Sequence, residues 1–215
     1  KTENKVSDNA EKIFSRSDVL IDFTTPESTF KNVLIAAKQH TAIVIGTTGL
    51  DEKVLKEIKK CSKNVAVLQS ANMSVCVNLF FKLVHQAAST LRDNEYDIEI
   101  AETHHKHKID APSGTAIALG KFAAKGRNSD FNETKIYDRT KSSIKRETGN
   151  IGFAVTRGGE IAGEHTVSFL GTNDRFDLTH KAQNRSIFVK GAIEAAIFLS
   201  KKKTGLYSME DVIKI

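Results

Sequence analysis

Residues 19–49 read VLIDFTTPESTFKNVLIAAKQHTAIVIGTTG, and this stretch sets the architecture of the first part of the chain. Val19–Phe23 and Ala42–Ile45 are apolar runs of the kind found in parallel strands that are buried on both faces. Between them, Thr25-Pro26 is typical of a helix N-cap followed by the first helical residue. Apolar side chains then recur at helical spacing, at Phe30, Val33, Leu34 and Ala37. The stretch therefore predicts a strand, a helix over 26–39 and a second strand.

The same alternation continues through a helix over 51–62 and a third strand at Val65–Leu68. Alternating strands and helices predict an α/β fold with a Rossmann-like, doubly wound parallel sheet. In such sheets, ligands bind beyond the carboxyl ends of the strands. Three loops leave those ends, at Asp22–Pro26, Gly46–Gly49 and Ser70–Met73. We expect a ligand at these loops.

The second part of the chain has a different pattern. A long helix is predicted from Ser74 to about Leu91, a strand at 96–103 that ends in a histidine cluster, and a helix over 112–125. Strand candidates of an antiparallel pattern follow, at Lys135–Tyr137, Ile151–Thr156, His165–Leu170 and Arg175–His180. Residues 127–134 and 139–149 are polar and predict loops, and the chain closes with a helix over 187–202 and a final turn at 209–213. This half predicts an α+β domain with a mixed, mainly antiparallel sheet.

Composition excludes several classes of protein. The 215 residues are 40% apolar and 27% charged, which is ordinary for a globular protein. The net charge of +6 comes from scattered lysines and not from one basic face, so we expect no nucleic-acid partner. No apolar run reaches the roughly 18 residues of a membrane span, and no signal peptide is visible. The two cysteines have no metal or redox spacing, which favours a reducing compartment. Together, these features lead us to expect a cytoplasmic protein without a membrane partner.

Residues 102–115 read E-T-H-H-K-H-K-I-D-A-P-S-G-T and gather titratable side chains beside a predicted helix start. Pro112 suits the first helical turn because its fixed φ is already helical. The backbone N–H groups of Ser113, Gly114 and Thr115 would then lie at a helix N-terminus, which favours an anion. Lys108 adds a positive charge. The stretch therefore favours a small carboxylate ligand that receives a proton.

The residues alone leave three interpretations of this cluster open. The histidines could belong to a polar surface loop without a function. They could bind a metal through His105, His107 and Asp110, although no further ligand at a recognisable spacing completes such a site. They could also act as a general acid next to an anion-binding helix start.

The pattern E-x-H-H-x-x-K-x-D-x-P-S-G-T resembles the signature of the dihydrodipicolinate reductase family. The loops after the predicted strands agree. Gly46–Gly49 is similar to the family's G-T-T-G loop, Ser70–Ser74 to its A-x-N-[FM]-S loop, and Asp22–Thr24 to its D-F-[ST] loop. The resemblance implies that these loops contact NADH or NADPH, through Phe23, Gly46, Thr47, Thr48, Ser70, Ala71, Asn72 and Met73.

The resemblance also implies a reaction and the residues that carry it. It implies reduction of 4-hydroxy-tetrahydrodipicolinate, a small dicarboxylate of the diaminopimelate and lysine pathway, without a metal. His104 and Lys108 match the proton-transfer positions. Substrate carboxylates would be held by His105, Ser113, Gly114 and Thr115. Residues 1–75 and 186–215 would bind the dinucleotide, and residues 76–185 would bind substrate and form a homotetramer.

The family's glycine-rich pyrophosphate turn does not occur before Val19. We therefore expect that about the first βαβ element of the family is missing from these residues, together with the residue that distinguishes NADH from NADPH. Two other functional hypotheses follow from the sequence. One is a carboxylate-binding relative that has lost catalysis, and the other is a metal-dependent hydrolase.

Overall fold

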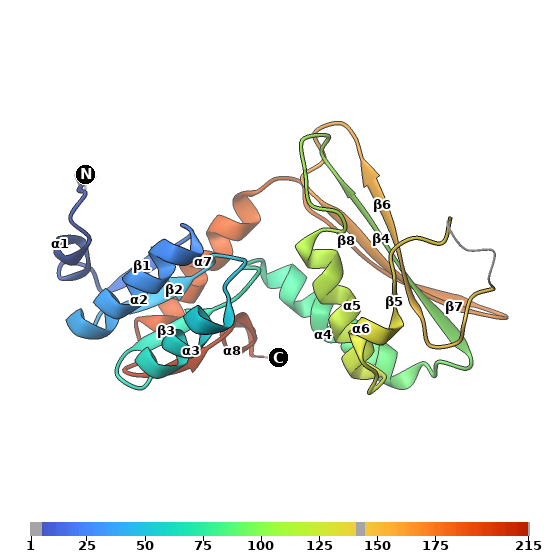
Figure 1. Ribbon diagram of the computed structural model, residues 1–215, viewed down its shortest axis with the longest axis horizontal. Coiled ribbons are helices and arrows are strands. Elements are labelled where there is room, and N and C mark those ends of the chain that lie inside the picture. The colour runs from blue at the N-terminus through green and yellow to red at the C-terminus, as the bar shows by residue number, and fades with distance from the viewer. Residues whose placement is uncertain (1–5, 141–144, 215) are drawn as a thin grey trace. The chain divides into compact units, whose positions relative to one another are not determined.

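The computed structural model describes residues 6–140 and 145–214. Residues 141–144, inside the predicted loop 139–149, lie outside the described part of the chain. The chain divides into two compact units, the first formed by Lys1–Val75 with Ser186–Ile215 and the second by Cys76–Arg185. Each unit has its own sheet (Figure 1).

The first unit contains a parallel sheet with the strand order β1-β2-β3-β9. Its strands are β1 (Val19–Asp22), β2 (Ala42–Ile45), β3 (Ala66–Gln69) and β9 (Gly205–Tyr207). Its helices are α1 (Ala10–Phe14), α2 (Pro26–Gln39), α3 (Glu52–Cys61), α7 (Ser186–Leu199) and α8 (Met209–Ile213). As the sequence predicted, Thr25 caps α2, where its side chain accepts a hydrogen bond from the backbone N–H of Ser28. The sequence did not predict β9, because three residues are too few to show a strand period.

Helices cover both faces of this parallel sheet. Alternate side chains of a strand point to opposite faces. Ile43 and Ile45 of β2 accordingly pack in one cluster with residues of α2 and α3. Ala42 and Val44 pack in a second cluster with residues of α7 and α8. This arrangement explains why β2 is apolar at every position and why it reads as a continuous run in the sequence.

The carboxyl ends of β1, β2 and β3 lie side by side. The N–H of Gly46 donates to the carbonyl of Asp22 over 2.8 Å, and the N–H of Ser70 donates to the carbonyl of Ile45 over 3.1 Å. The three loops predicted to contact a ligand therefore share one edge of the sheet.

The second unit contains a mixed sheet with the strand order β5-β6-β4-β7-β8. Its elements are α4 (Val75–Thr90, of which Cys76 onward belongs to this unit), β4 (Tyr96–His104), α5 (Gly114–Gly126), α6 (Phe131–Thr134), β5 (Lys135–Ile136), β6 (Ile151–Arg157), β7 (Glu164–Gly171) and β8 (Arg175–Lys181). Strands β7 and β8 are antiparallel, as predicted, but β6 runs parallel to β4 and β5 runs parallel to β6. Helices α5 and α6 lie between β4 and β5, so this connection brings the chain back to start β5 in the same direction as β4, as in a βαβ unit.

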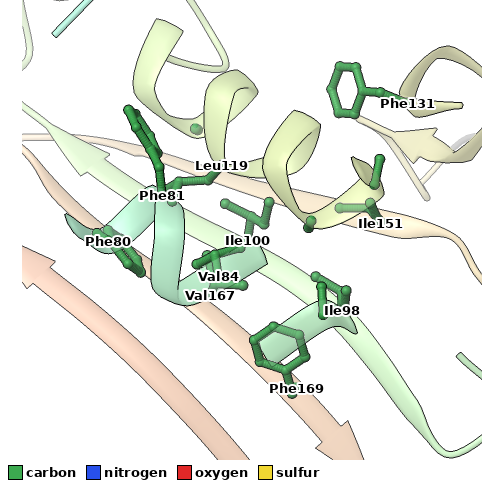
Figure 2. Packing of buried hydrophobic residues seen from close by; sticks show 14 of the residues in the cluster. Phe80, Phe81, Val84, Ile98, Ile100, Leu119, Phe131, Ile151, Val167 and Phe169 are labelled. Carbon is green, nitrogen blue, oxygen red and sulfur yellow. The ribbon is translucent and has the colours of Figure 1, made fainter. Parts of the chain in front are cut away.

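Helices α4 and α5 pack on one face of this sheet, and the apolar core lies between them and the strands. Figure 2 shows side chains from both layers of this core, namely Phe80, Phe81, Val84, Ile98, Ile100, Leu119, Phe131, Ile151, Val167 and Phe169. The short helix α6 lies in the segment predicted to be a loop, and it buries Phe131 in the core. No helix in the described part of the chain is both long and apolar enough to cross a membrane.

We predict that Gly191→Ala destabilises the first unit. A Cβ atom at Gly191 would lie 1.7 Å from the backbone carbonyl oxygen of Met73, so α7 and the loop after β3 would have to separate. Overpacking of this kind costs about 1–3 kcal/mol, which should exceed the gain of about 1 kcal/mol in helix propensity. Urea unfolding followed by circular dichroism measures the change. Glu194→Ala, in the same helix, is the control and should stay within about 0.5 kcal/mol of the parent. Equal or greater stability of Gly191→Ala would contradict this prediction and show that α7 and the loop after β3 can accommodate a methyl group.

Candidate active site

Strand β4 carries a row of inward side chains that changes character along its length. Ile98 and Ile100 lie in the apolar core, and Glu102 and His104 continue the row because alternate residues share a face. Glu102 is 2% exposed and His104 is 8% exposed. A carboxylate at this depth has to be paired and hydrogen-bonded. The partners of Glu102 therefore define the centre of the site.

Four hydrogen bonds converge on the Glu102 carboxylate. Arg157 donates from Nη1 to Oε2 and from Nη2 to Oε1, each over 2.8 Å. The backbone N–H of Ser113 donates to Oε1 over 2.9 Å, and Nδ1 of His104 lies 2.5 Å from Oε2. Sheet register explains the arginine, because Arg157 on β6 pairs with His104 on β4. Strands β4 and β6 and the start of α5 thus meet at one carboxylate.

The charges of this cluster follow from burial and hydrogen bonding. Burial acts to raise the pKa of Glu102, but the hydrogen bonds from Arg157, His104 and Ser113 outweigh it and hold the pKa below its usual value. Burial lowers the pKa of His104, and the charges of Lys108 and Arg157 lower it further against the opposing effect of Glu102. The cluster therefore rests as an ionised Glu102 and a neutral His104. Because a carboxylate only accepts hydrogen bonds, the imidazole hydrogen lies on Nδ1.

Ser113 joins the start of α5 to His165 on β7. As the N-cap of α5, its Oγ accepts a hydrogen bond from the N–H of Ala116 over 3.1 Å. The same oxygen lies 3.0 Å from Nε2 of His165. Burial, followed by repulsion from His104 when that ring is protonated, lowers the pKa of His165 to about 4. His165 is therefore neutral near pH 7, and its Nε2 shares a hydrogen bond with the Ser113 hydroxyl.

The structure corrects two expectations about this helix start. The sequence predicted a helix over 112–125 with Pro112 in its first turn, whereas α5 begins at Gly114 and Pro112 precedes the cap. The sequence also predicted a free backbone N–H at Ser113, but Ser113 is buried and donates that N–H to Glu102. The physical reason is that the buried carboxylate needs donors. Ser113 therefore fixes the helix start and does not offer its amide to a ligand.

The next backbone amide of the helix start faces a carboxylate of the chain itself. Lys108 donates from Nζ to Oδ1 of Asp110 over 2.8 Å. This hydrogen bond is the main cause that holds the pKa of Asp110 below its usual value, and a hydrogen bond from the backbone of Gly114 adds to it. Gly114 is exposed and Thr115 is half-buried. Lys108 and Gly114, which the sequence predicted to act on a ligand, thus both contact Asp110 in this structure.

His105 and His107 lie on the loop that follows β4. Their ring centroids are 6.2 Å apart, and the N–H of His105 donates to the carbonyl of Ile161 over 2.8 Å. His107 is exposed, and its Nε2 lies 3.9 Å from a carboxylate oxygen of Glu160. Across residues 6–140 and 145–214, no group of three or more His, Cys, Asp or Glu side chains is arranged to hold a metal ion.

The loops of the first unit offer an exposed edge at the carboxyl ends of the strands. Phe23 is 52% exposed, and its ring lies so close to Gly46 that a Cβ atom there would be 2.3 Å from it. Thr48 and Ala71 are also exposed. An aromatic ring and two small side chains are therefore exposed at this edge of the sheet.

Other residues predicted to contact the dinucleotide have side chains that are buried or hydrogen-bonded within the chain. The hydroxyl of Thr47 is buried and accepts a hydrogen bond from Thr29 over 2.9 Å. Met73 is 1% exposed in the core cluster shared with α7 and α8, so its side chain does not face a ligand. The Ser70 hydroxyl donates to the carbonyl of Asn72 over 2.8 Å, which closes the loop on itself. Contacts from Thr47, Ser70 and Met73 would therefore have to come from their backbones.

Arg157 and His165 were not predicted as site residues. They lie 55 and 63 residues beyond Glu102 and reach it only through the pairing of β6 and β7 with β4. One signal in the sequence pointed to such partners. Glu102 and His104 are two apart in a predicted strand and share its face, so a buried carboxylate needed a cation from elsewhere. The sequence could not say which one.

The fold and the site together define a two-unit α/β protein of the dinucleotide-binding class, with an acid–base cluster in its second unit. Residues 1–73 match the family described as "Dihydrodipicolinate reductase, N-terminus", and residues 76–213 match "Dihydrodipicolinate reductase, C-terminus". The chain belongs to the dihydrodipicolinate reductase family.

Individual relatives agree with this assignment. The chain is 42% identical to the 4-hydroxy-tetrahydrodipicolinate reductase of Nitrosospira multiformis over 97% of this chain and 77% of that protein. It is 44% identical to the enzyme of the same name from Cupriavidus metallidurans over 97% of this chain and 78% of that protein. Among solved structures, it is similar to the dipicolinate-bound dihydrodipicolinate reductase from Paenisporosarcina sp. TG-14. That similarity has a TM-score of 0.77 and 26% identity, and it covers 94% of this chain and 77% of that one.

We predict that His165 makes the protein less stable in acid. Its pKa is about 4 in the folded state and near 6.5 in the unfolded chain, so the unfolded state binds more protons between these values. The contribution of His165 to the free energy of unfolding is fully present above about pH 6.5. It is lost as the pH falls towards about 4, which lowers the free energy of unfolding by ~2–4 kcal/mol in total. Urea unfolding at pH 7 and pH 5 should show a smaller pH effect in His165→Gln than in the parent. The exposed His107→Gln is the control. Equal pH effects in the parent and His165→Gln would contradict the prediction.

Proposed function

We propose that this protein catalyses the NADH- or NADPH-dependent reduction of 4-hydroxy-tetrahydrodipicolinate to tetrahydrodipicolinate, in which the 4-hydroxyl group leaves as water and the unsaturated ring gains a hydride and a proton. The observation that carries the proposal is the buried Glu102–His104 pair next to Lys108 and the start of α5, in a chain of this family. The solved relative from Paenisporosarcina is described as bound to dipicolinate, a dicarboxylate of the same kind. Family membership and the site chemistry thus favour the same substrate class.

The first unit supports a nicotinamide cofactor. When bound, the reduced nicotinamide supplies a hydride to the unsaturated ring of the substrate. The exposed Phe23 ring, Thr48 and Ala71 at the carboxyl ends of parallel strands are suited to hold such a group. We assign Gly46, Thr47, Ser70, Asn72 and Met73 to the same contact surface through the backbone of their loops.

His104 is suited to supply the proton that follows the hydride. Glu102 engages Nδ1, so Nε2 is the atom through which a proton passes to the substrate. The resting imidazole is neutral, but the two carboxylates of a bound substrate would raise the pKa of His104 and favour its charged form. The proton then leaves Nε2 and forms a C–H bond on the substrate ring. Lys108, whose charge already acts on His104, serves in the same step.

The groups that hold the substrate carboxylates lie around the start of α5. Helix N-termini bind anions because their amides and dipole favour negative charge. Gly114 and Thr115 are exposed or half-buried there, and half-buried His105 is on the preceding loop. Ser113 contributes by capping the helix. We further propose, from the family resemblance, a cytoplasmic homotetramer formed through the second unit, which sedimentation would test.

We predict that His104→Gln and Lys108→Ala each lower kcat for the dicarboxylate by about 10²–10⁴-fold, the contribution of a positioned proton donor. Oxidation of NADH and NADPH at 340 nm measures turnover, and circular dichroism checks the fold. Lys106→Ala and His107→Gln are matched controls from the same exposed loop and should keep the parent's kcat.

Parent-like turnover in either site variant would overturn the assignment. Dipicolinate and cofactor binding without any turnover in the parent protein would favour the hypothesis of a carboxylate-binding protein instead.

We predict that Asp110→Asn binds dipicolinate more tightly than the parent. The Asp110 carboxylate engages Lys108 and Gly114, and it would repel an incoming carboxylate at the same groups. Asp110 is largely exposed, so the effect should be modest, about 2–5-fold in Kd. Titration calorimetry measures it, and Glu160→Gln on the neighbouring loop is the control. Weaker binding by Asp110→Asn would show that the aspartate helps to place Lys108 and does not compete with the ligand.

A further inference from the structure

Glu102 and Arg157 connect the parts of the site that lie on different elements. The carboxylate binds His104 on its own strand, Arg157 on β6 and the Ser113 amide at the start of α5. Arg157 also donates from Nη2 to the carbonyl of Asp110 over 2.7 Å. That carbonyl belongs to the loop that carries Lys108. The pair therefore holds the imidazole, the lysine loop and the helix start in one network.

The network also determines which nitrogen of His104 is available. Nδ1 is engaged by Glu102, so Nε2 is the nitrogen left for a substrate. Space beside Nε2 is kept by Gly163, where a Cβ atom would lie 2.9 Å from Nε2. Gly163 has a φ of +150°, a conformation that other residues rarely adopt. The Gly163 backbone and the Glu102 carboxylate thus both leave Nε2 of His104 as the nitrogen available to a substrate.

We propose that Glu102 and Arg157 are positioning residues for the reductase reaction: Glu102 fixes the tautomer and orientation of His104, and Arg157 fixes Glu102 relative to the loop of Lys108. The proposal rests on the proposed function for its kinetic consequences but not for the tautomer of His104. Neither residue has to touch the substrate. Both act through His104.

Among the residues that the structure describes, five charged or titratable groups around His104 enter the expected pH dependence, namely Glu102, Lys108, Asp110, Arg157 and His165. Glu102 on β4 favours the charged imidazole. Lys108 on the loop and Arg157 on β6 oppose it. Asp110 neutralises part of the charge of Lys108, and neutral His165 on β7 packs edge-on with ring centroids 5.0 Å apart. Loss of the Glu102 charge therefore leaves Lys108 and Arg157 near His104 without the carboxylate that favours the charged imidazole.

Glu102→Gln tests the kinetic part of the proposal. We expect kcat to fall by about 10²-fold, within the contribution of a positioned general acid, with KM changed much less. The high-pH limb of the kcat/KM profile should move to lower pH, because His104 loses the carboxylate that favours its charged form. A purely structural Glu102 would lower the unfolding midpoint and leave that limb in place, which would overturn the proposal.

Arg157→Lys distinguishes the role of Arg157 from that of Glu102. It keeps the negative charge of Glu102 but loses the two-pronged contact and the link to the Asp110 carbonyl. We expect kcat to fall about tenfold with the pH limb unmoved, the result of misplacement alone. Glu99→Gln is the matched control, because Glu99 also lies on β4 and pairs with Arg139 and Arg146 away from the site. It should keep the parent's kcat and pH profile.

The tautomer of His104 can be measured without substrate or cofactor. In the parent protein labelled with ¹⁵N, long-range ¹H–¹⁵N correlation spectra at pH 7.5 should show His104 protonated on Nδ1. In folded Glu102→Gln that preference should weaken or reverse. An Nε2-protonated ring in the parent would overturn the proposal even if the enzyme is active. A parent without turnover but with the expected tautomer would overturn the proposed function and the kinetic part of this inference, and it would support the part that concerns the tautomer of His104.

Discussion

The second unit depends on one buried carboxylate. Removing an ion from water costs several kcal/mol unless charge and hydrogen bonds compensate it. Glu102 obtains that compensation from Arg157, His104 and the Ser113 amide, which come from two strands and a helix start. Each of these groups is therefore held in place by the same requirement. The geometry of the proposed site therefore follows from the hydrogen bonds and the positive charge that compensate the buried Glu102 carboxylate.

The site is continuous with the apolar core. Ile98 and Ile100 of β4 pack against α4 and α5. Glu102 and His104 are the next residues on the same face of this strand, and both are buried. The rigid packing of the first pair fixes the direction of the second. The groups expected to meet a ligand follow on a loop and a helix start, and they are His105, Lys108, Gly114 and Thr115. A rigid strand with a functional loop at its end is a common way to place reactive groups.

Much of the first unit could be predicted because its signals are local. The N-cap at Thr25, the helix over 26–39 and the strand at Ala42–Ile45 depend on residues within one or two turns of each other. Strand β9 and helix α6 could not be predicted, because each is too short to show a period. The direction of β6 depended on the path of a connection of more than forty residues between β4 and β6. The pattern of residues within a single helix or strand does not indicate the path of such a connection.

By itself, the sequence determined the alternation that forms the parallel sheet, and the spacing that places His104 and Lys108 at the end of β4 and before α5. It also indicated the family, through motifs confined to short stretches. The tertiary structure alone decided which cation pairs with Glu102, that His165 supports Ser113, and that Asp110 engages Lys108 and Gly114. The physical reason is that a buried charge fixes only the need for a partner. Strand pairing between distant residues selects the partner.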